Sequence, residues 1–172
     1  MNKTKQICIT GMGIALFVIL AMVIRVPVFE NYYLCLGYVA MAVYLYSVGT
    51  VSGTIVGTLG TVLYCVLTNG LRGMPGWVLG NLVIGIIVGV TFRYARKIRN
   101  NWAHLIVCIV AIVIGNILGI LIVKSGVECF LYAQPFFVRV AKNIYAFVAD
   151  AFVLSVSLPV CWILDGKIRK FL

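Results

Sequence analysis

The chain has 172 residues and a formal net charge of +10, with 63% of its residues hydrophobic and only 10% charged. A soluble domain carries about 25% charged residues, so this composition leaves too little polar surface to cover a water-soluble globule. The basic residues are scattered between apolar segments, which favours charges at a membrane surface over nucleic-acid binding. The sequence therefore predicts an all-α integral membrane protein.

Apolar segments long enough to cross a membrane follow one another with short connections. A transmembrane helix needs about 20 mainly apolar residues. The six predicted spans cover residues 7–24, 33–46, 51–67, 76–92, 102–123 and 143–164, and they make the whole chain one membrane domain. The last helix is expected to start just after Pro135, so that its first turns project out of the membrane.

The distribution of lysine and arginine predicts the orientation. With six spans, both termini lie on the same side of the membrane. The side that holds the termini and the 93–101 connection carries nine of these residues, and the opposite side carries five. Because cytoplasmic segments are enriched in Lys and Arg, both termini are predicted to be cytoplasmic. The connections at 25–32, 69–75 and 124–142 then face outward.

Small residues recur on two of the predicted spans. Gly11 and Ala15 stand four residues apart in the first span, a spacing that lets two helices touch closely in lipid. Their partner is either another helix of this chain or a second protein. Glycines also line one face of the third span and predict a close helix contact there: Gly49, Gly53, Gly57 and Gly60.

The connection between the third and fourth spans is unusual for so apolar a chain. Residues 69–76 contain three glycines together with Arg72 and Pro75. Glycine permits unusual backbone angles and proline suits the first position of a helix, so we expect a turn that starts the fourth span. This stretch is interpreted as the rim or gate of a pocket, with Trp77 in the pocket wall.

Three polar side chains lie at a similar depth inside the predicted spans. Asn81, Asn116 and Asp150 are five to seven residues inward from the outer end of their spans, which is about 7–11 Å at 1.5 Å per residue. Amide and ionisable groups are costly in hydrocarbon, so they face the bundle interior and often mark a ligand site. Arg139 and Asn143 share a helix face with Asp150. The alternatives are interhelical hydrogen bonds for the asparagines and a basic partner for Asp150.

Their convergence predicts a pocket that opens outward. Asn81, Asn116 and Asp150 form its floor, and Trp77 and Tyr64 are available for stacking. The basic residues expected around its mouth, either to meet an anionic group or as solvated loop charges, are Arg25, Arg72, Arg139 and Lys142.

Nothing in the sequence supports catalysis, a metal site or a cofactor. The sequence contains no nucleophile elbow, no H-E-x-x-H and no Walker motif. It has four acidic residues, one histidine, His104, and six cysteines without a C-x-x-C pair. We therefore expect a non-enzymatic protein whose cysteines act as small buried hydrophobes.

The whole chain resembles the substrate-binding S components of energy-coupling-factor (ECF) vitamin transporters. The likeness rests on its size, the six spans, the basic connection after the fourth span, the Gly11-Met-Gly-Ile-Ala15 element and the Gly-rich passage that ends at Asn81. The resemblance implies that a vitamin binds in the outer half of the bundle, under the connections that follow the first and third spans.

The resemblance also implies partners. The first-span small-residue element of such proteins docks on a transmembrane coupling subunit, which is joined to two cytoplasmic ATPases. Gly11 and Ala15 would be the docking face here, with glycine in place of the first alanine. The whole S component is pictured as toppling in the membrane.

The resulting hypothesis is an ECF S component in the cell membrane that captures a water-soluble vitamin. The outer basic residues favour a carboxylate-bearing ligand such as pantothenate, folate or biotin. Riboflavin, thiamine, a pyridoxine-like compound and a queuosine precursor remain open, because Asp150 is also suited to a cationic ring or an amine. The alternatives are a structural membrane scaffold and a small secondary transporter driven by protonation of Asp150.

Overall fold

The computed structural model of the chain describes residues 3–23, 25–29 and 32–171. In chain order, its elements are α1 (Lys3–Val23), β1 (Arg25–Phe29), β2 (Tyr32–Cys35), α2 (Gly37–Ser47), α3 (Thr50–Leu67), α4 (Met74–Ala95), α5 (Asn101–Asn116), the π-helix η1 (Ile117–Lys124), α6 (Ser125–Tyr132) and α7 (Phe136–Phe171). The predominantly helical architecture agrees with the sequence prediction, to which the structure adds two short strands.

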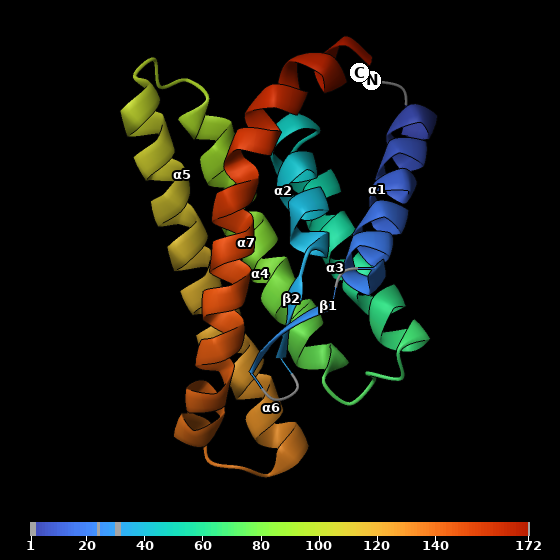
Figure 1. Cartoon of the computed structure of the whole chain (residues 1–172), viewed down its shortest axis with the longest axis vertical. Helices are drawn as coiled ribbons and strands as arrows, with labels where there is room; N and C mark the ends of the chain where they lie inside the picture. The colour runs from blue at the N-terminus through green and yellow to red at the C-terminus, as the bar shows by residue number, and fades with distance from the viewer. Residues whose placement is uncertain (1–2, 24, 30–31, 172) are drawn as a thin grey trace.

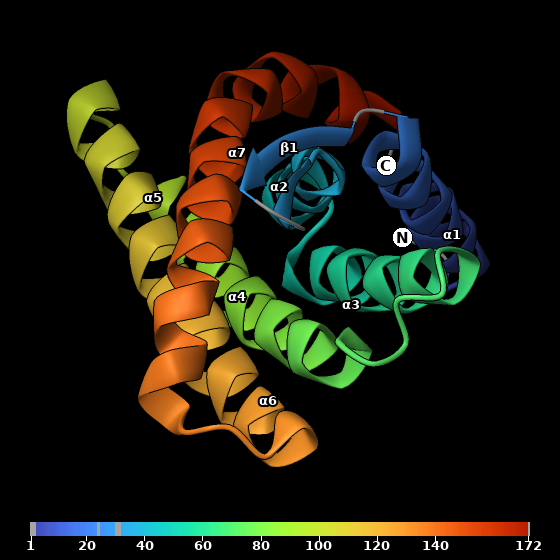
Figure 2. The same cartoon turned by 60° about the horizontal axis from the view of Figure 1, so that its bottom comes forward.

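The short helix α2 is the centre of the bundle. Figure 2 shows it surrounded by α1, α3, α4 and α7, all of which it contacts, while α5 and α6 lie on the flank. Nine of its eleven residues are buried. A helix that is apolar on all sides belongs in the interior of a bundle, and this segment carries no charged residue.

Glycines let the neighbouring helices approach α2 and α4 closely. A Cβ atom on Gly53 would lie 2.5 Å from the backbone nitrogen of Leu45 in α2, and one on Gly57 would meet Met41 in the same helix. A Cβ atom on Gly85 of α4 would lie 2.5 Å from the Thr54 hydroxyl. The predicted glycine face of α3 is therefore a close helix contact within the bundle.

Five helical segments are long and apolar enough to cross a membrane: Lys3–Val23, Thr50–Leu67, Met74–Ala95, Asn101–Tyr132 and Phe136–Ile168. The central α2 is too short to be among them, since eleven residues span about 16 Å at 1.5 Å per residue and the hydrocarbon layer is about 30 Å thick. The segment predicted as the span 33–46 is thus a strand followed by a short helix.

The structure differs from the sequence prediction between residues 124 and 142. We expected a long connection there, but α5, η1 and α6 form one continuous helical segment as far as Tyr132. It ends where Ala133 adopts a left-handed conformation with φ of 49°. Two further residues lead to α7, which begins directly after Pro135, as the sequence predicts.

The start of α1 and the end of α7 lie at the same end of the bundle (Figure 1). We call this the terminus end. The strands, α6 and the connection between α3 and α4 lie at the opposite end, which we call the hairpin end. The predicted loop at 25–32 contains β1, which pairs antiparallel with β2 there, with Arg25 opposite Cys35 and Val26 opposite Leu34.

Candidate ligand-binding cavity

A cavity of about 430 Å³ lies at the hairpin end of the bundle. It sits at the N-terminal end of α2, where the short central helix leaves room between α1, α3, α4 and α7. Its lining comes from almost every element and consists of Ala21, Leu34, Cys35, Tyr64, Cys65, Thr68, Gly70, Gly73, Trp77, Lys124, Glu128, Ala146 and Asp150. We refer to it as the hairpin-end cavity.

Two aromatic rings form one wall of this cavity. Tyr64 of α3 and Trp77 of α4 meet edge to face, with ring centroids 5.7 Å apart and an angle of 85° between the planes. Pro75 in the first turn of α4 fixes the start of this helix. Trp77 follows two residues later and lines the cavity together with Gly70 and Gly73 of the predicted rim.

A buried hydrogen-bond network lies behind the aromatic wall. The Trp77 indole donates to the hydroxyl of Tyr38 over 2.9 Å, and this hydroxyl donates to the Asn81 carbonyl over 2.6 Å. The Asn81 amide donates in turn to the Thr61 hydroxyl over 2.7 Å and to the Gly57 carbonyl over 3.3 Å. Asn81 is fully buried and does not line the cavity. Asn81 therefore supports Trp77 of the aromatic wall through the Tyr38 hydroxyl.

The cavity also contains charged side chains from both flanks. Asp150 of α7 is only 4% exposed and lines the cavity. It interacts electrostatically with Lys124 and contacts the Tyr38 hydroxyl. Lys124, at the end of η1, lines the same cavity.

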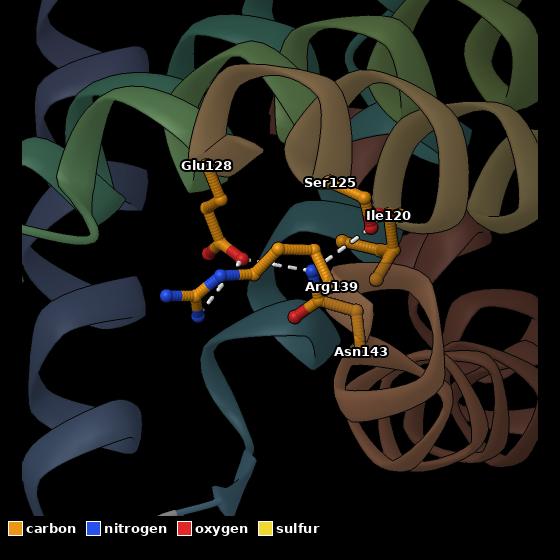
Figure 3. Close-up of polar contacts among 5 residues, drawn as sticks. All are labelled: Ile120, Ser125, Glu128, Arg139 and Asn143. Atoms are coloured by element: carbon orange, nitrogen blue, oxygen red, sulfur yellow. Dashed lines mark hydrogen bonds and ion pairs between the residues drawn. The ribbon is translucent and has the colours of Figure 1, made fainter. Parts of the chain in front are cut away.

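Glu128 of α6 provides a second carboxylate at the cavity (Figure 3). Its Oε2 atom accepts a hydrogen bond of 2.9 Å from the Asn143 amide and lies 4.0 Å from Nη1 of Arg139. The Asn143 amide also donates to the Ser125 hydroxyl over 3.0 Å, and this hydroxyl donates to the carbonyl of Ile120 over 3.3 Å. The contacts tie α6 to the first turns of α7.

Two arginines predicted at the pocket mouth meet on one aromatic ring. The Arg139 guanidinium lies 3.9 Å from the centroid of the Tyr132 ring, and that of Arg72 lies 5.6 Å from it. Neither arginine lines the cavity. They connect the α3–α4 turn and α7 to the end of α6 through cation–π contacts. Lys142 is exposed, and the Arg25 side chain lies outside the described residues.

The structure thus brings Tyr64, Trp77 and Asp150 to the cavity lining, which the predicted floor residues Asn81 and Asn116 do not reach. Asn143 reaches it through Glu128, whereas Asn116 donates only to the Ile112 carbonyl of its own helix over 2.8 Å. The lining residues Lys124 and Glu128 were missed because the sequence placed them in an external connection. The cysteines Cys35 and Cys65 were missed because isolated cysteines in apolar segments give no binding signal.

The predicted partner-docking residues lie on the outside of the bundle. Gly11 and Ala15 are both exposed on α1, and a Cβ atom on Gly11 would meet nothing within 4 Å. Gly11 borders a mainly apolar groove of about 460 Å³ between α1 and α3. Gly13, by contrast, faces inward, where a Cβ atom would lie 2.6 Å from the Tyr44 ring.

Residues 1–163 match the family model of the ECF-type riboflavin transporter S component. The chain belongs to this family. As an ECF S component, it is a multi-pass membrane protein and a non-enzymatic, vitamin-capturing subunit of an ABC transporter. This confirms the family, the membrane location and the absence of enzymatic activity that the sequence predicted.

Relatives and a solved structure agree with this assignment. The chain is 26% identical over 165 residues to the UPF0397 protein str0306 of Streptococcus thermophilus (strain CNRZ 1066), covering 90% of this chain and 91% of that protein. It is 30% identical over 159 residues to a UPF0397 protein of Streptococcus gordonii, covering 89% and 83%. The crystal structure of an S component for biotin from an ECF-type ABC transporter has the same fold, with a TM-score of 0.69 and 16% identity over 99% of this S component and 95% of that chain.

The different surroundings of the two buried asparagines lead to a stability prediction. Replacing Asn81 by Leu removes the acceptor of the buried Tyr38 hydroxyl and the donor to the Thr61 hydroxyl, so we expect a loss of about 1–3 kcal/mol in the free energy of unfolding. In Asn116→Leu, the side-chain amide that is removed donates only to a carbonyl of its own helix, and the Asn116 side-chain oxygen has no hydrogen-bond partner. We expect this change to be nearly neutral. Unfolding of the purified proteins in detergent measures both, and equal losses would contradict the assigned roles.

Proposed function

We propose that this S component captures riboflavin or a closely similar planar heteroaromatic vitamin in the hairpin-end cavity. Binding involves no chemical change, and ATP hydrolysis by partner subunits drives uptake. The observation that carries the proposal is the cavity itself, in which the Tyr64–Trp77 wall faces the buried Asp150 and Lys124. Its volume of about 430 Å³ lies within the range of small-ligand sites.

The orientation follows from charge. The terminus end carries the nine Lys and Arg residues counted on the side of the termini, which supports a cytoplasmic location for this end. The hairpin-end cavity then opens to the extracytoplasmic side. In this arrangement α2, together with β2, forms the sixth and incomplete crossing. The α3–α4 turn and the strand pair lie over the cavity.

The lining supports an uncharged, hydrogen-bonding ligand with an aromatic ring. Trp77 and Tyr64 provide π-faces and edges for a planar ring. Asp150 and Glu128 accept hydrogen bonds, and Lys124 donates them. We assign Trp77 and Asp150 as direct ligand contacts, whereas Asn81 positions Trp77 through Tyr38. Riboflavin fits these groups because it combines a flat tricyclic ring with a chain of hydroxyl groups, and the family description names the same vitamin.

The charge balance of the lining argues against a carboxylate-bearing vitamin as first choice. Two carboxylates and one lysine line the cavity, while Arg72 and Arg139 are engaged with Tyr132. The same balance favours a cationic vitamin such as thiamine as the second candidate. The positively charged ring of such a vitamin would interact with Asp150 in place of Lys124.

The α1 surface supports docking on a coupling subunit. Gly11 and Ala15 are exposed and leave open space beside α1, and small residues let a partner helix approach the backbone closely. We propose that this face binds the transmembrane coupling subunit, which carries two cytoplasmic ATPases. The face is built from the outer side of α1, away from the inward-facing Phe17 and Ala21.

The ligand proposal predicts the outcome of a vitamin panel on the detergent-purified chain. Riboflavin is expected to co-purify, as identified by mass spectrometry, and to raise the unfolding temperature. At a concentration 100 times Kd, the stabilisation is about 2.7 kcal/mol. Biotin, pantothenate and folate are expected to give no shift. Stabilisation by thiamine alone would favour the cationic class, and no bound molecule together with no shift from any vitamin would reject vitamin capture.

The aromatic wall predicts a specific loss of affinity. Trp77→Leu removes the stacking surface and is expected to weaken riboflavin binding by about tenfold or more, the equivalent of about 1.4 kcal/mol. Trp162→Leu is the matched control, because Trp162 stacks on His104 at the other end of the bundle. Quenching of flavin fluorescence measures both affinities. A similar loss in the two variants would locate the effect in folding instead of ligand contact.

The docking proposal predicts that complex formation and ligand binding can be separated. Gly11→Leu fits the bundle without a clash but blocks a close helix contact, so we expect it to bind riboflavin and to lose co-purification with the coupling and ATPase subunits. Gly166→Leu, another glycine with nothing within 4 Å of a Cβ, is expected to retain both. An intact complex with Gly11→Leu would refute this docking face.

Two other mechanisms make different predictions for the same preparations. A structural scaffold would bind no small molecule. A secondary transporter driven by protonation of Asp150 would carry its substrate into liposomes without the ATPases. An S component is expected to transport only when the coupling and ATPase subunits are present.

A further inference from the structure

The corner of the hairpin-end cavity next to α6 is rich in hydrogen-bond acceptors. Glu128 is 6% exposed and lines the cavity. Its Oε2 atom takes the contacts with Asn143 and Arg139, and Oε1 takes part in neither of them. In Figure 3, Oε1 points away from Asn143.

The neighbouring asparagine positions the Glu128 side chain. Asn143 is fully buried, and its amide nitrogen already serves Ser125 and Glu128. Its Oδ1 atom is buried without a hydrogen-bond partner. Asn143 does not line the cavity itself, and its amide contributes to the site by holding the Glu128 carboxylate.

The chain holds Glu128 in this corner by three means. The π-helix η1 has i→i+5 hydrogen bonds, so its turns are wider than those of an α-helix and it rotates α6 relative to α5. Ser125 follows the same spacing, since its hydroxyl bonds to the carbonyl of Ile120. Arg139 lies 4.0 Å from the carboxylate and offsets its charge, which makes a buried carboxylate tolerable.

We propose that Glu128, positioned by Asn143 and Arg139, is a specificity-determining residue that accepts a hydrogen bond from a hydroxyl group of the ligand. This inference rests on the proposed function and deepens it. For riboflavin, the ring lies along the Tyr64–Trp77 wall and the hydroxylated side chain reaches the Glu128 corner. A phosphate on that side chain would bring a negative charge next to Glu128 and is rejected.

The test compares three flavins on the purified full chain: riboflavin, lumiflavin, in which a methyl group replaces the hydroxylated side chain, and flavin mononucleotide, in which the chain is phosphorylated. The wild-type protein is expected to bind riboflavin at least tenfold more tightly than either of the others. Equal affinities of the wild-type protein for riboflavin and lumiflavin would overturn the inference without any variant.

Glu128→Gln then tests the negative charge alone, because glutamine is uncharged but keeps a side-chain oxygen that can accept from Asn143. We expect riboflavin affinity to fall by about tenfold to a hundredfold, in line with hydrogen bonds to charged groups. Lumiflavin affinity is expected to stay within about twofold, and the discrimination against flavin mononucleotide to shrink. Equal losses for riboflavin and lumiflavin would show a merely structural role and overturn the inference.

Asp165→Asn is the matched control. Asp165 is likewise a carboxylate paired with an arginine, since it lies 3.5 Å from Arg96, but it does not line the hairpin-end cavity. All three flavin affinities are expected to be unchanged in this variant. If the wild-type protein binds no flavin at all, the proposed function fails with the inference. If it binds riboflavin but Glu128→Gln leaves the selectivity intact, only the inference fails.

Discussion

The hydrogen bond from the Tyr38 hydroxyl to Asn81 fixes the central helix, and the cavity depends on it. The bond measures 2.6 Å and joins α2 to α4 in a completely buried position. An apolar helix such as α2 could slide or rotate among its neighbours at little cost, because one apolar face packs much like another. A single directional bond removes that freedom, since breaking it leaves the buried Asn81 carbonyl oxygen without its donor and the Tyr38 hydroxyl without this acceptor. The Trp77 indole donates a hydrogen bond to the same Tyr38 hydroxyl.

The glycines of α3 make this bond possible. Asn81 also reaches Thr61 and the Gly57 carbonyl on α3, which requires α3 and α4 to lie close together. Gly57 and Gly85 provide that proximity, because a Cβ atom at either position would collide with the neighbouring helix. Close packing in one half of the bundle and a short α2 in the other leave the space that becomes the hairpin-end cavity.

The sequence predicted the features that depend on residue composition. It missed those that depend on which way a side chain faces and on where a helix ends. Trp77 and Asp150 were found because an aromatic residue after a Gly-Pro turn and a carboxylate within an apolar span are both conspicuous. Asn81 and Asn116 gave the same signal, yet one joins three helices and the other bonds only to its own. Lys124 and Glu128 were missed because the π-helix η1 continues the helical segment past the expected end of the span, and a π-helix has no evident sequence signature. Strand β1 was likewise taken for a loop, and most of β2 was taken for the start of a membrane span.

The proposed ligand cavity and the proposed docking face lie on different sides of the molecule, and α1 contributes to both. Its outward side carries Gly11 and Ala15, and its inward side contributes Ala21 to the cavity lining. Between them, Phe17 is fully buried and meets the edge of the Tyr38 ring at 6.2 Å, while Gly60 gives it room on α3. Tyr38 in turn bonds to Trp77 and contacts Asp150. The proposed ligand contact Trp77 is therefore joined by a continuous set of packed groups to α1, the helix whose outer side carries the proposed docking face.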